Sequence, residues 1–313
     1  MAFSYRAYGL HIVSELEMGE FHCPLTHDAD GPSGDVLIDV GKVPREVEAP
    51  AVASDDYQVG AREILLTIPS VARYWAREGK RLTIAPERRA DPSAVLLYLK
   101  GSALAAILHQ RGIVPLHASA IEHDGHCVAF LGDSGAGKST LASMLGRRGY
   151  RIICDDVLVV RIGKDGTAEA CSGPPVIKLW PESLDIAGFA ETQAPFEFSD
   201  FRKHRITARD RFVEGSLPIS RFYVLRWLLP QTAEPEIAPL KPFEAMVALR
   251  SNVYRLQLVT AMGREHTFMR FTSALMARAK AFCFSRARLM ERAELHLGAL
   301  ERHFQASTTC DLV

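Results

Sequence analysis

Residues 132–140, GDSGAGKST, have the composition and spacing of a loop that binds phosphate. They satisfy the pattern G-x-x-x-x-G-K-[ST], in which glycines let successive backbone N–H groups point into one concavity and the next helix adds partial positive charge. We expect Lys138 to reach the β- and γ-phosphates of a nucleotide and the Ser139 hydroxyl to bind Mg²⁺. The sequence therefore predicts a site for ATP and Mg²⁺, with a chance match of a glycine-rich turn as the alternative. The expected nucleotide-binding residues are Gly132, Asp133, Ser134, Gly135, Ala136, Gly137, Lys138, Ser139 and Thr140.

Two adjacent aspartates, Asp155 and Asp156, follow the apolar run RIIC, one helix and one strand after this loop. Neighbouring carboxylates are costly unless a cation or a proton separates their charges. Phosphoryl transfer can use one acid to support Mg²⁺ and another to accept the proton of the attacking hydroxyl. The pair therefore predicts an acid and base site beside the loop, and a solvated turn between two strands is the alternative.

Three further residues are weaker candidates. His117 lies in a short apolar run upstream of the loop, where a single histidine is more often structural than functional. The segment 201–211, FRKHRITARDR, gathers positive charge in an otherwise neutral chain. Because the outer oxygens of a transferring phosphoryl group need positive charge, Lys203 or Arg205 could contact phosphate or an acidic part of the substrate. A solvated loop or strand edge is the alternative for this segment.

The elements around these residues have the order that a phosphate loop requires. Asp124 and Gly125 stand between two apolar runs, a strong hairpin signal, and the second run leads directly into the loop. Apolar residues at helical spacing over 140–148 predict a helix that ends at Gly149. Strands are expected in RIICDD, VLVVRIG, TAEACS, RFYVLRWLLP and KAFCFSRA, with helices near 242–254, 263–278 and 289–304.

The N-terminal part of the sequence has a different pattern from the segment around the glycine loop. Residues 1–88 contain short alternating pieces such as AYGLHIVSE and EILLTIP between turn-rich segments, which indicates a small β-rich module. Asp91 and Pro92 then provide the start of a helix that ends near Gly112. We therefore expect two domains, residues 1–88 and 89–313.

Bulk properties exclude several classes of partner. Lys plus Arg and Asp plus Glu each number 37 in 313 residues, so neither nucleic acid nor an anionic membrane is expected as the main partner. No apolar run reaches the roughly 18 residues of a membrane span, since Lys100 interrupts LLYLKGSALAAIL. The six cysteines are scattered without metal or disulfide spacing, which favours a cytoplasmic protein. The three tryptophans are expected in the core or at an interface.

The run LHASAIEHDGHCVAFLGDSGAGKSTLASMLGRRGYRIICDD resembles the catalytic domain of HPr serine kinase/phosphorylase over roughly residues 115–160. In that family a histidine precedes a hairpin, the hairpin leads to a GDSG-type loop, and a helix and strand lead to paired aspartates. The resemblance implies that His117 is the active-site histidine and that Lys138 and Ser139 are the phosphate-loop pair. It also implies that Asp155 is the general base and Asp156 the acid associated with the metal.

The similarity is thinner beyond this run. The bifunctional enzymes carry a glycine-rich ExRGxG signature downstream of the aspartates, and GPPVIKLWPESLDIAGFA has no such run. The segment from Tyr5 to Glu15 instead resembles the "YxxxGLxIxSE" phrase of HPr-kinase-related proteins. Some members of that group phosphorylate a serine of a lasso-peptide precursor, which implies a protein or peptide substrate. A homo-oligomer is left open.

These observations predict an α/β fold, with a P-loop kinase core built on a mixed sheet flanked by helices and a small β-rich N-terminal module. The predicted function is an ATP-dependent kinase that phosphorylates a serine hydroxyl. A small-molecule kinase of the adenylate or shikimate type is the first alternative. A P-loop NTPase switch is the second, although the chain has neither an LSGGQ nor an NKxD motif.

Overall fold

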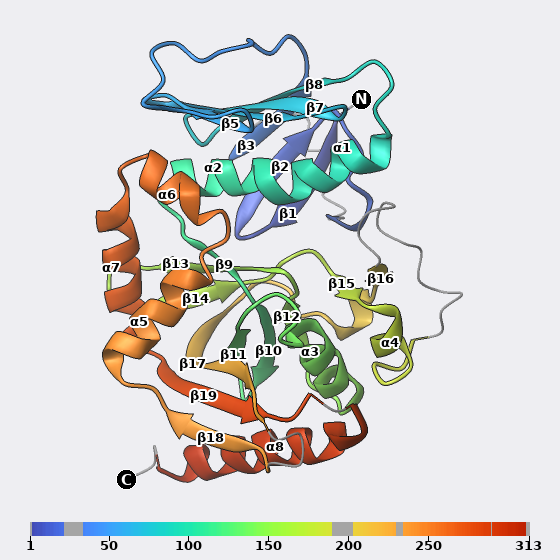
Figure 1. Cartoon of the computed structure of the whole chain (residues 1–313), viewed down its shortest axis with the longest axis vertical. Helices are drawn as coiled ribbons and strands as arrows, with labels where there is room; N and C mark the ends of the chain where they lie inside the picture. The colour runs from blue at the N-terminus through green and yellow to red at the C-terminus, as the bar shows by residue number, and fades with distance from the viewer. Residues whose placement is uncertain (1, 22–33, 190–202, 230–233, 289, 311–313) are drawn as a thin grey trace.

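The computed structural model describes residues 2–21, 34–189, 203–229, 234–288 and 290–310. Two sheets lie one above the other along the long axis of the molecule, with the helical segment 92–110 beneath the upper sheet (Figure 1). The upper sheet comes from the N-terminal residues, and the lower sheet carries the glycine loop.

The upper sheet has eight strands within the described residues, in the order β1-β2-β3-β8-β7-β6-β5-β4. Buried positions recur at every second residue in LHIVS and ARYWAR, so one face of each strand packs into the core. A short 3-10 turn, η1 (Gly19–Phe21), follows the second strand. The strands are β1 (Phe3–Ala7), β2 (Leu10–Ser14), β3 (Val36–Val40), β4 (Val52–Ala53), β5 (Tyr57–Val59), β6 (Glu63–Ile68), β7 (Ala72–Arg77) and β8 (Arg81–Pro86).

The helical segment below this sheet consists of α1 (Pro92–Tyr98), the π-helical turn η2 (Leu99–Ala103) and α2 (Leu104–Gln110). Asp91 caps it as predicted, because its carboxylate accepts a hydrogen bond from the Ser93 N–H at 2.8 Å. Its apolar side chains share one core with the upper sheet. By length and composition it is the one helix in the described ranges that could cross a membrane, and most of it is buried in the protein.

The lower sheet has nine strands within the described residues, in the order β12-β10-β11-β17-β14-β13-β9, and β19 pairs with both β17 and β18. A separate two-stranded sheet joins β15 to β16. The strands are β9 (Pro115–His117), β10 (Ser119–His123), β11 (His126–Leu131), β12 (Ile152–Cys154), β13 (Val157–Ile162), β14 (Ala168–Cys171), β15 (Val176–Leu179), β16 (His204–Thr207), β17 (Ser216–Trp227), β18 (Glu236–Pro239) and β19 (Lys280–Arg286).

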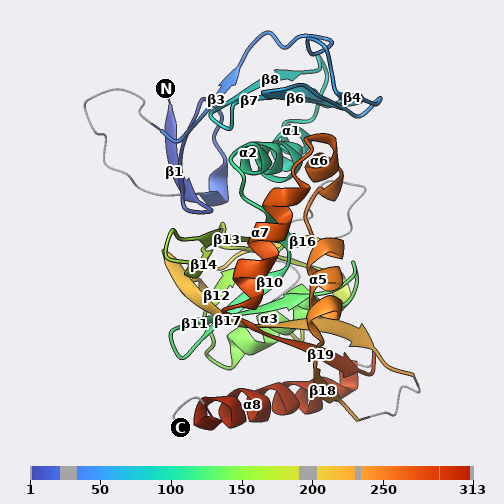
Figure 2. The same ribbon diagram turned by 90° about the vertical axis from the view of Figure 1, so that its left-hand side faces the viewer.

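Helices cover both faces of the lower sheet. On one face, α3 and α8 pack through Leu141, Leu145, Leu297 and Phe304. On the other, α5 and α7 contribute buried side chains that include Leu249 and Phe268, and α7 stands beside α5 when the molecule is turned (Figure 2). The helices are α3 (Lys138–Arg147), α4 (Pro181–Leu184), α5 (Pro242–Ser251), α6 (Leu256–Ala261), α7 (Glu265–Met276) and α8 (Ala293–Cys310), with short 3-10 turns η4 (Arg209–Arg211) and η5 (Met290–Arg292).

The predicted fold class is confirmed, as are the hairpin at Asp124 and Gly125 and the strand, loop and helix order around the glycines. The piece AYGLHIVSE is two strands rather than one, because Tyr8 and Gly9 turn with φ of 59° and 71°. The division into domains 1–88 and 89–313 stays a prediction. One core cluster contains side chains of the upper sheet, of segment 92–110 and of strands β13 and β14.

Candidate active site

The glycine loop forms a backbone concavity between β11 and α3. Gly132, Gly135 and Gly137 have φ of 140°, 82° and 83°, a region that residues with a Cβ rarely adopt. A Cβ on Gly132 would also lie 2.9 Å from the Leu225 carbonyl oxygen, so the first position of the loop requires glycine. The loop turns directly into the first N–H groups of α3, as expected for an anion site.

Lys138 lies at the first turn of α3 with its side chain folded back over the loop. Its Nζ donates to the Gly132 carbonyl at 2.7 Å and to the Asp133 carbonyl at 3.2 Å. Burial lowers the pKa of the Lys138 ammonium to about 8, and the negative charges of Asp155 and Asp156 oppose this effect. Both carboxylates therefore act electrostatically on the loop lysine.

Asp155 is buried and held by two donors. The Ser119 hydroxyl donates to Oδ1 at 2.5 Å, and the Lys178 N–H donates to Oδ2 at 2.9 Å. Each carboxylate oxygen can accept more than one hydrogen bond, so acceptor capacity remains for a substrate hydroxyl. These contacts fix the orientation that a general base needs.

Asp156 and His117 are brought together by strand pairing. His117 on β9 lies opposite Val157 on β13, and its Nδ1 is 3.0 Å from the Asp156 carbonyl and 3.2 Å from Asp156 Oδ1. Burial by itself would raise the pKa of the Asp156 carboxyl, but the Lys178 ammonium and the His117 ring hold it well below its usual range. Asp156 also has φ of 75°, a strained conformation that is common at functional sites.

Lys178, on β15, was not singled out from the sequence. Its Nζ lies 3.1 Å from Asp156 Oδ2 while its backbone N–H binds Asp155, so one residue contacts both acids. Two strands, β13 and β14, separate β15 from the aspartates in the sequence. Only the folding of the chain brings Lys178 close to them. The sequence signal available was a single lysine in an apolar strand.

Asn252, at the end of α5, was also missed. Its Oδ1 accepts from the Gly132 N–H at 2.9 Å, its Nδ2 donates to the Ala248 carbonyl at 2.8 Å, and its carbonyl accepts from the His117 N–H at 2.7 Å. One buried amide thus joins the start of the phosphate loop to the strand that carries the histidine. Nothing local in the sequence marks this asparagine.

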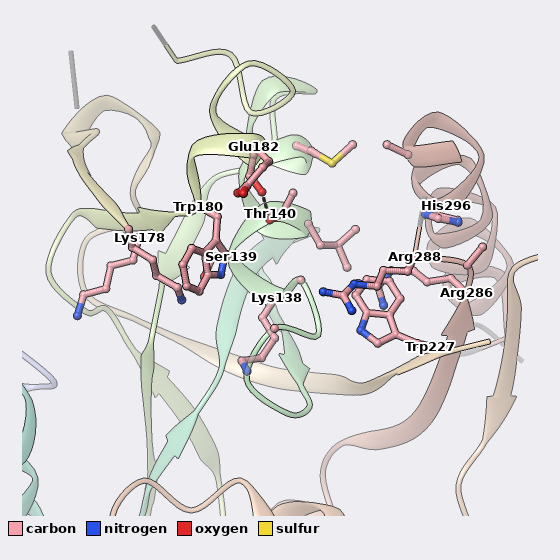
Figure 3. A pocket seen from close by; sticks show the side chains of 18 residues that line it. Lys138, Ser139, Thr140, Lys178, Trp180, Glu182, Trp227, Arg286, Arg288 and His296 are labelled. Carbon is pink, nitrogen blue, oxygen red and sulfur yellow. Dashed lines mark hydrogen bonds between the residues drawn. The ribbon is translucent and has the colours of Figure 1, made fainter. Parts of the chain in front are cut away.

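A cavity of about 430 Å³ opens beside the loop and α3. Two walls enclose it, as Figure 3 shows, with Ser139 and Thr140 between them. The predicted contact Lys203 lines it, whereas Asp133 and Ser134 lie on the exposed side of the loop and do not. One wall contains Lys178, Trp180 and Glu182, and the other contains Trp227, Arg286, Arg288 and His296.

A second, smaller cavity of about 40 Å³ borders the two acids. Asp155, Asp156 and Lys178 line it together with the predicted contact Arg205. Tyr8 in the turn after β1, Phe21 of η1 and Lys100 of η2 also line it. Lys178 therefore lines both cavities, whereas Asp155 and Asp156 line only the smaller one.

Within the described residues, no three His, Cys, Asp or Glu side chains group as a metal site. Mg²⁺ beside a triphosphate needs only one or two protein oxygen ligands, because phosphates and water supply the others. The Ser139 hydroxyl lines the larger cavity and the Asp156 carboxylate lines the smaller one, and both are oxygen donors of the kind that Mg²⁺ takes. Asp156 already holds one cation, the Lys178 ammonium, which indicates a carboxylate suited to positive charge.

No protein-family model matches the sequence, and no curated protein matches it. Among solved structures, the chain is similar to the Hpr(Ser) kinase/phosphatase from Coxiella burnetii, with 13% sequence identity and a TM-score of 0.36. The alignment covers 63% of this chain and 94% of that chain. Identity this low leaves the function to be inferred from the residues of the site itself.

Proposed function

We propose that the protein is an ATP-dependent kinase of the HPr-kinase-related type, which transfers the γ-phosphoryl group to a serine hydroxyl of a protein or peptide. This proposal rests on one observation: the glycine loop and the two acids, both of which phosphoryl transfer needs, act on the same lysine. Lys138 belongs to a loop shaped for a triphosphate, and Asp155 and Asp156 act electrostatically on that same lysine.

The residues divide the work as follows in this proposal. Backbone N–H groups of residues 135–139 and the Lys138 ammonium bind the phosphates. Asp155 accepts the proton of the serine hydroxyl. As this proton leaves, the serine oxygen bonds to the γ-phosphorus, and the bond between the γ-phosphorus and the oxygen that bridges to the β-phosphate breaks. Ser139 and Asp156 hold Mg²⁺, which when bound offsets the charge on the phosphate oxygens. His117 positions Asp156 through the contacts of its Nδ1.

The second cavity, of about 40 Å³, has room for a hydroxyl group beside Asp155 but not for a peptide, so the main chain of a protein or peptide acceptor would lie outside it. Asp155 lines this cavity and not the larger one beside the loop, so the proposal assigns the acceptor hydroxyl to the smaller cavity and the nucleotide to the larger one. Arg205 and Lys100 line it, which favours an acidic residue near the serine. A lasso-peptide precursor is one such acceptor, since the segment from Tyr5 to Glu15 resembles HPr-kinase-related proteins and some members of that group phosphorylate such precursors.

The test is to incubate the full chain with Mg·ATP and either serine peptides, with and without acidic neighbours, or a panel of small metabolites. Mass spectrometry should detect a phosphate on serine, with preference for the acidic peptides. Phosphorylation of metabolites alone would favour the small-molecule kinase. Hydrolysis of ATP at the same rate with and without any acceptor would favour an NTPase switch.

A further inference from the structure

The larger cavity extends past the phosphate loop to a wall whose chemistry the proposed reaction does not use. Three adjacent parallel strands, β11, β17 and β19, end at this edge of the lower sheet. The loop follows β11, whereas Trp227 ends β17 and Arg286 ends β19. Ligands of open α/β sheets bind outside the carboxyl ends of parallel strands, so both residues lie where the rest of a nucleotide would continue.

Trp227 and Arg286 form a stacked pair against the loop. The Arg286 guanidinium carbon lies 4.4 Å from the Trp227 ring centroid, and Nη2 donates to the Ala136 carbonyl at 2.6 Å. A Cβ on Gly137 would lie 2.9 Å from Arg286 Nη2 and 3.5 Å from the Trp227 ring. The pair is therefore in direct contact with the backbone that would hold the phosphates.

Two polar groups on this wall have unused hydrogen-bonding capacity. Arg286 is 4% exposed and His296 is 5% exposed. Among the described residues, neither Arg286 Nη1 nor His296 Nε2 has a hydrogen-bond partner. Burial lowers the pKa of His296 to about 4, so its ring is neutral at pH 7, whereas Arg286, with a pKa lowered by burial to about 10, stays charged. Buried polar groups without partners are rare in proteins and need an explanation, and a ligand in the cavity that these two residues line would provide one.

Trp227 keeps 39% of its surface exposed at this cavity. Aromatic side chains with an open surface stack well on nucleobases, whose flat rings add contact area with little dependence on base identity. Trp180, on the opposite wall, is 42% exposed, and the Lys203 ammonium lies over its ring at 5.5 Å. The Arg286 guanidinium lies closer to the Trp227 ring than Lys203 lies to Trp180, so the difference between the two tryptophans is that Trp227 lies against the loop, 3.5 Å from a Cβ placed on Gly137.

We propose that Trp227, Arg286 and His296 form the base-binding part of a purine nucleoside triphosphate site, with the base packed on the Trp227 and Arg286 pair. This rests on the proposed function, in which the loop holds the triphosphate. The base lies over the ends of β17 and β19, and the phosphates run from there to Lys138. Because stacking gives more contact to a larger ring, ATP and GTP bind more tightly than CTP.

The experiment compares ATP with inorganic tripolyphosphate, which has the phosphates and no base, by calorimetry on the full chain. Trp227→Leu should weaken ATP binding about ten- to hundredfold and leave tripolyphosphate affinity within about twofold. Trp227→Phe, which keeps an aromatic ring, should retain most of the ATP affinity. Trp180→Leu is the matched control and should bind both ligands as the unaltered protein does.

Intrinsic fluorescence gives an independent measurement, since the chain has three tryptophans. ATP should quench the emission, tripolyphosphate should not, and the quench should disappear in Trp227→Phe but persist in Trp180→Leu. Unchanged ATP affinity in Trp227→Leu would overturn the proposal, as would an equal loss of ATP and tripolyphosphate binding. Failure of the unaltered protein to bind tripolyphosphate would instead count against the phosphate loop and the kinase function.

Discussion

The charge on Lys138 makes nucleotide binding depend on pH in a range where most lysines do not titrate. Its ammonium has a pKa of about 8 without nucleotide, because the side chain is buried. About nine tenths of the molecules carry the charge at pH 7 and about one tenth at pH 9. Only the ammonium form attracts the triphosphate, so the neutral form has to take up a proton to bind. Apparent ATP affinity should therefore fall about tenfold between pH 7 and pH 9.

Calorimetric titration with ATP across this range measures the change directly. At pH 9 the binding heat should also depend on the ionisation enthalpy of the buffer, with uptake of about 0.9 proton for each nucleotide bound. The Lys138→Arg variant keeps its charge over the whole range, so any binding that it retains should show neither effect. A flat affinity profile for the unaltered protein, or proton release at pH 9, would refute the account of the buried lysine.

Three substitutions test the other residues of the site. Asp155→Asn should keep ATP affinity and lower phosphoryl transfer at least about a hundredfold, and a rate near that of the unaltered protein would remove Asp155 as the base. Lys178→Met removes the cation beside Asp156 and should lower the rate of phosphoryl transfer about ten- to hundredfold. Lys178→Arg should recover part of this rate. Equal rates in the unaltered protein and in both variants would show that the ion pair has no role in transfer. Asn252→Ala leaves the buried Gly132 N–H without its acceptor and should lower the free energy of unfolding by about 2 kcal/mol, which denaturant titration measures; unchanged stability would contradict the hydrogen bonds assigned to this amide.

Local sequence was enough to predict the order of strand, glycine loop and helix and the hairpin before it. Glycines, the hairpin turn and the apolar periodicity act over a few residues, so their physical meaning can be read directly from the chain. The acids were also found by position, because the single helix and strand that separate them from the loop form one compact unit. The fold class followed from the same patterns.

Residues that arrive from distant elements could not be predicted in this way. Asn252 reaches Gly132 across 120 positions of the sequence. Lys178 contacts the acids only because β15 lies back beside them after the chain has passed through β13 and β14. The tryptophans were expected in the core or at an interface, yet Trp227 ends a strand at a cavity. Hydropathy alone does not distinguish an indole that is buried in the core from one that lines an open cavity. The π-helical turn at Leu99 likewise lacks a local signal.

The turn at Tyr8 has a consequence for how the proposed enzyme would handle water. Tyr8 is buried, its N–H donates to the Ser172 carbonyl at 3.1 Å, and its side chain shares a cavity with Asp155 and Asp156. A base open to bulk solvent would activate water as readily as a serine and would waste ATP. In the proposed enzyme, the turn at Tyr8 would help to keep bulk water away from Asp155, so the fidelity of the reaction would depend on residues far from the phosphate loop in sequence.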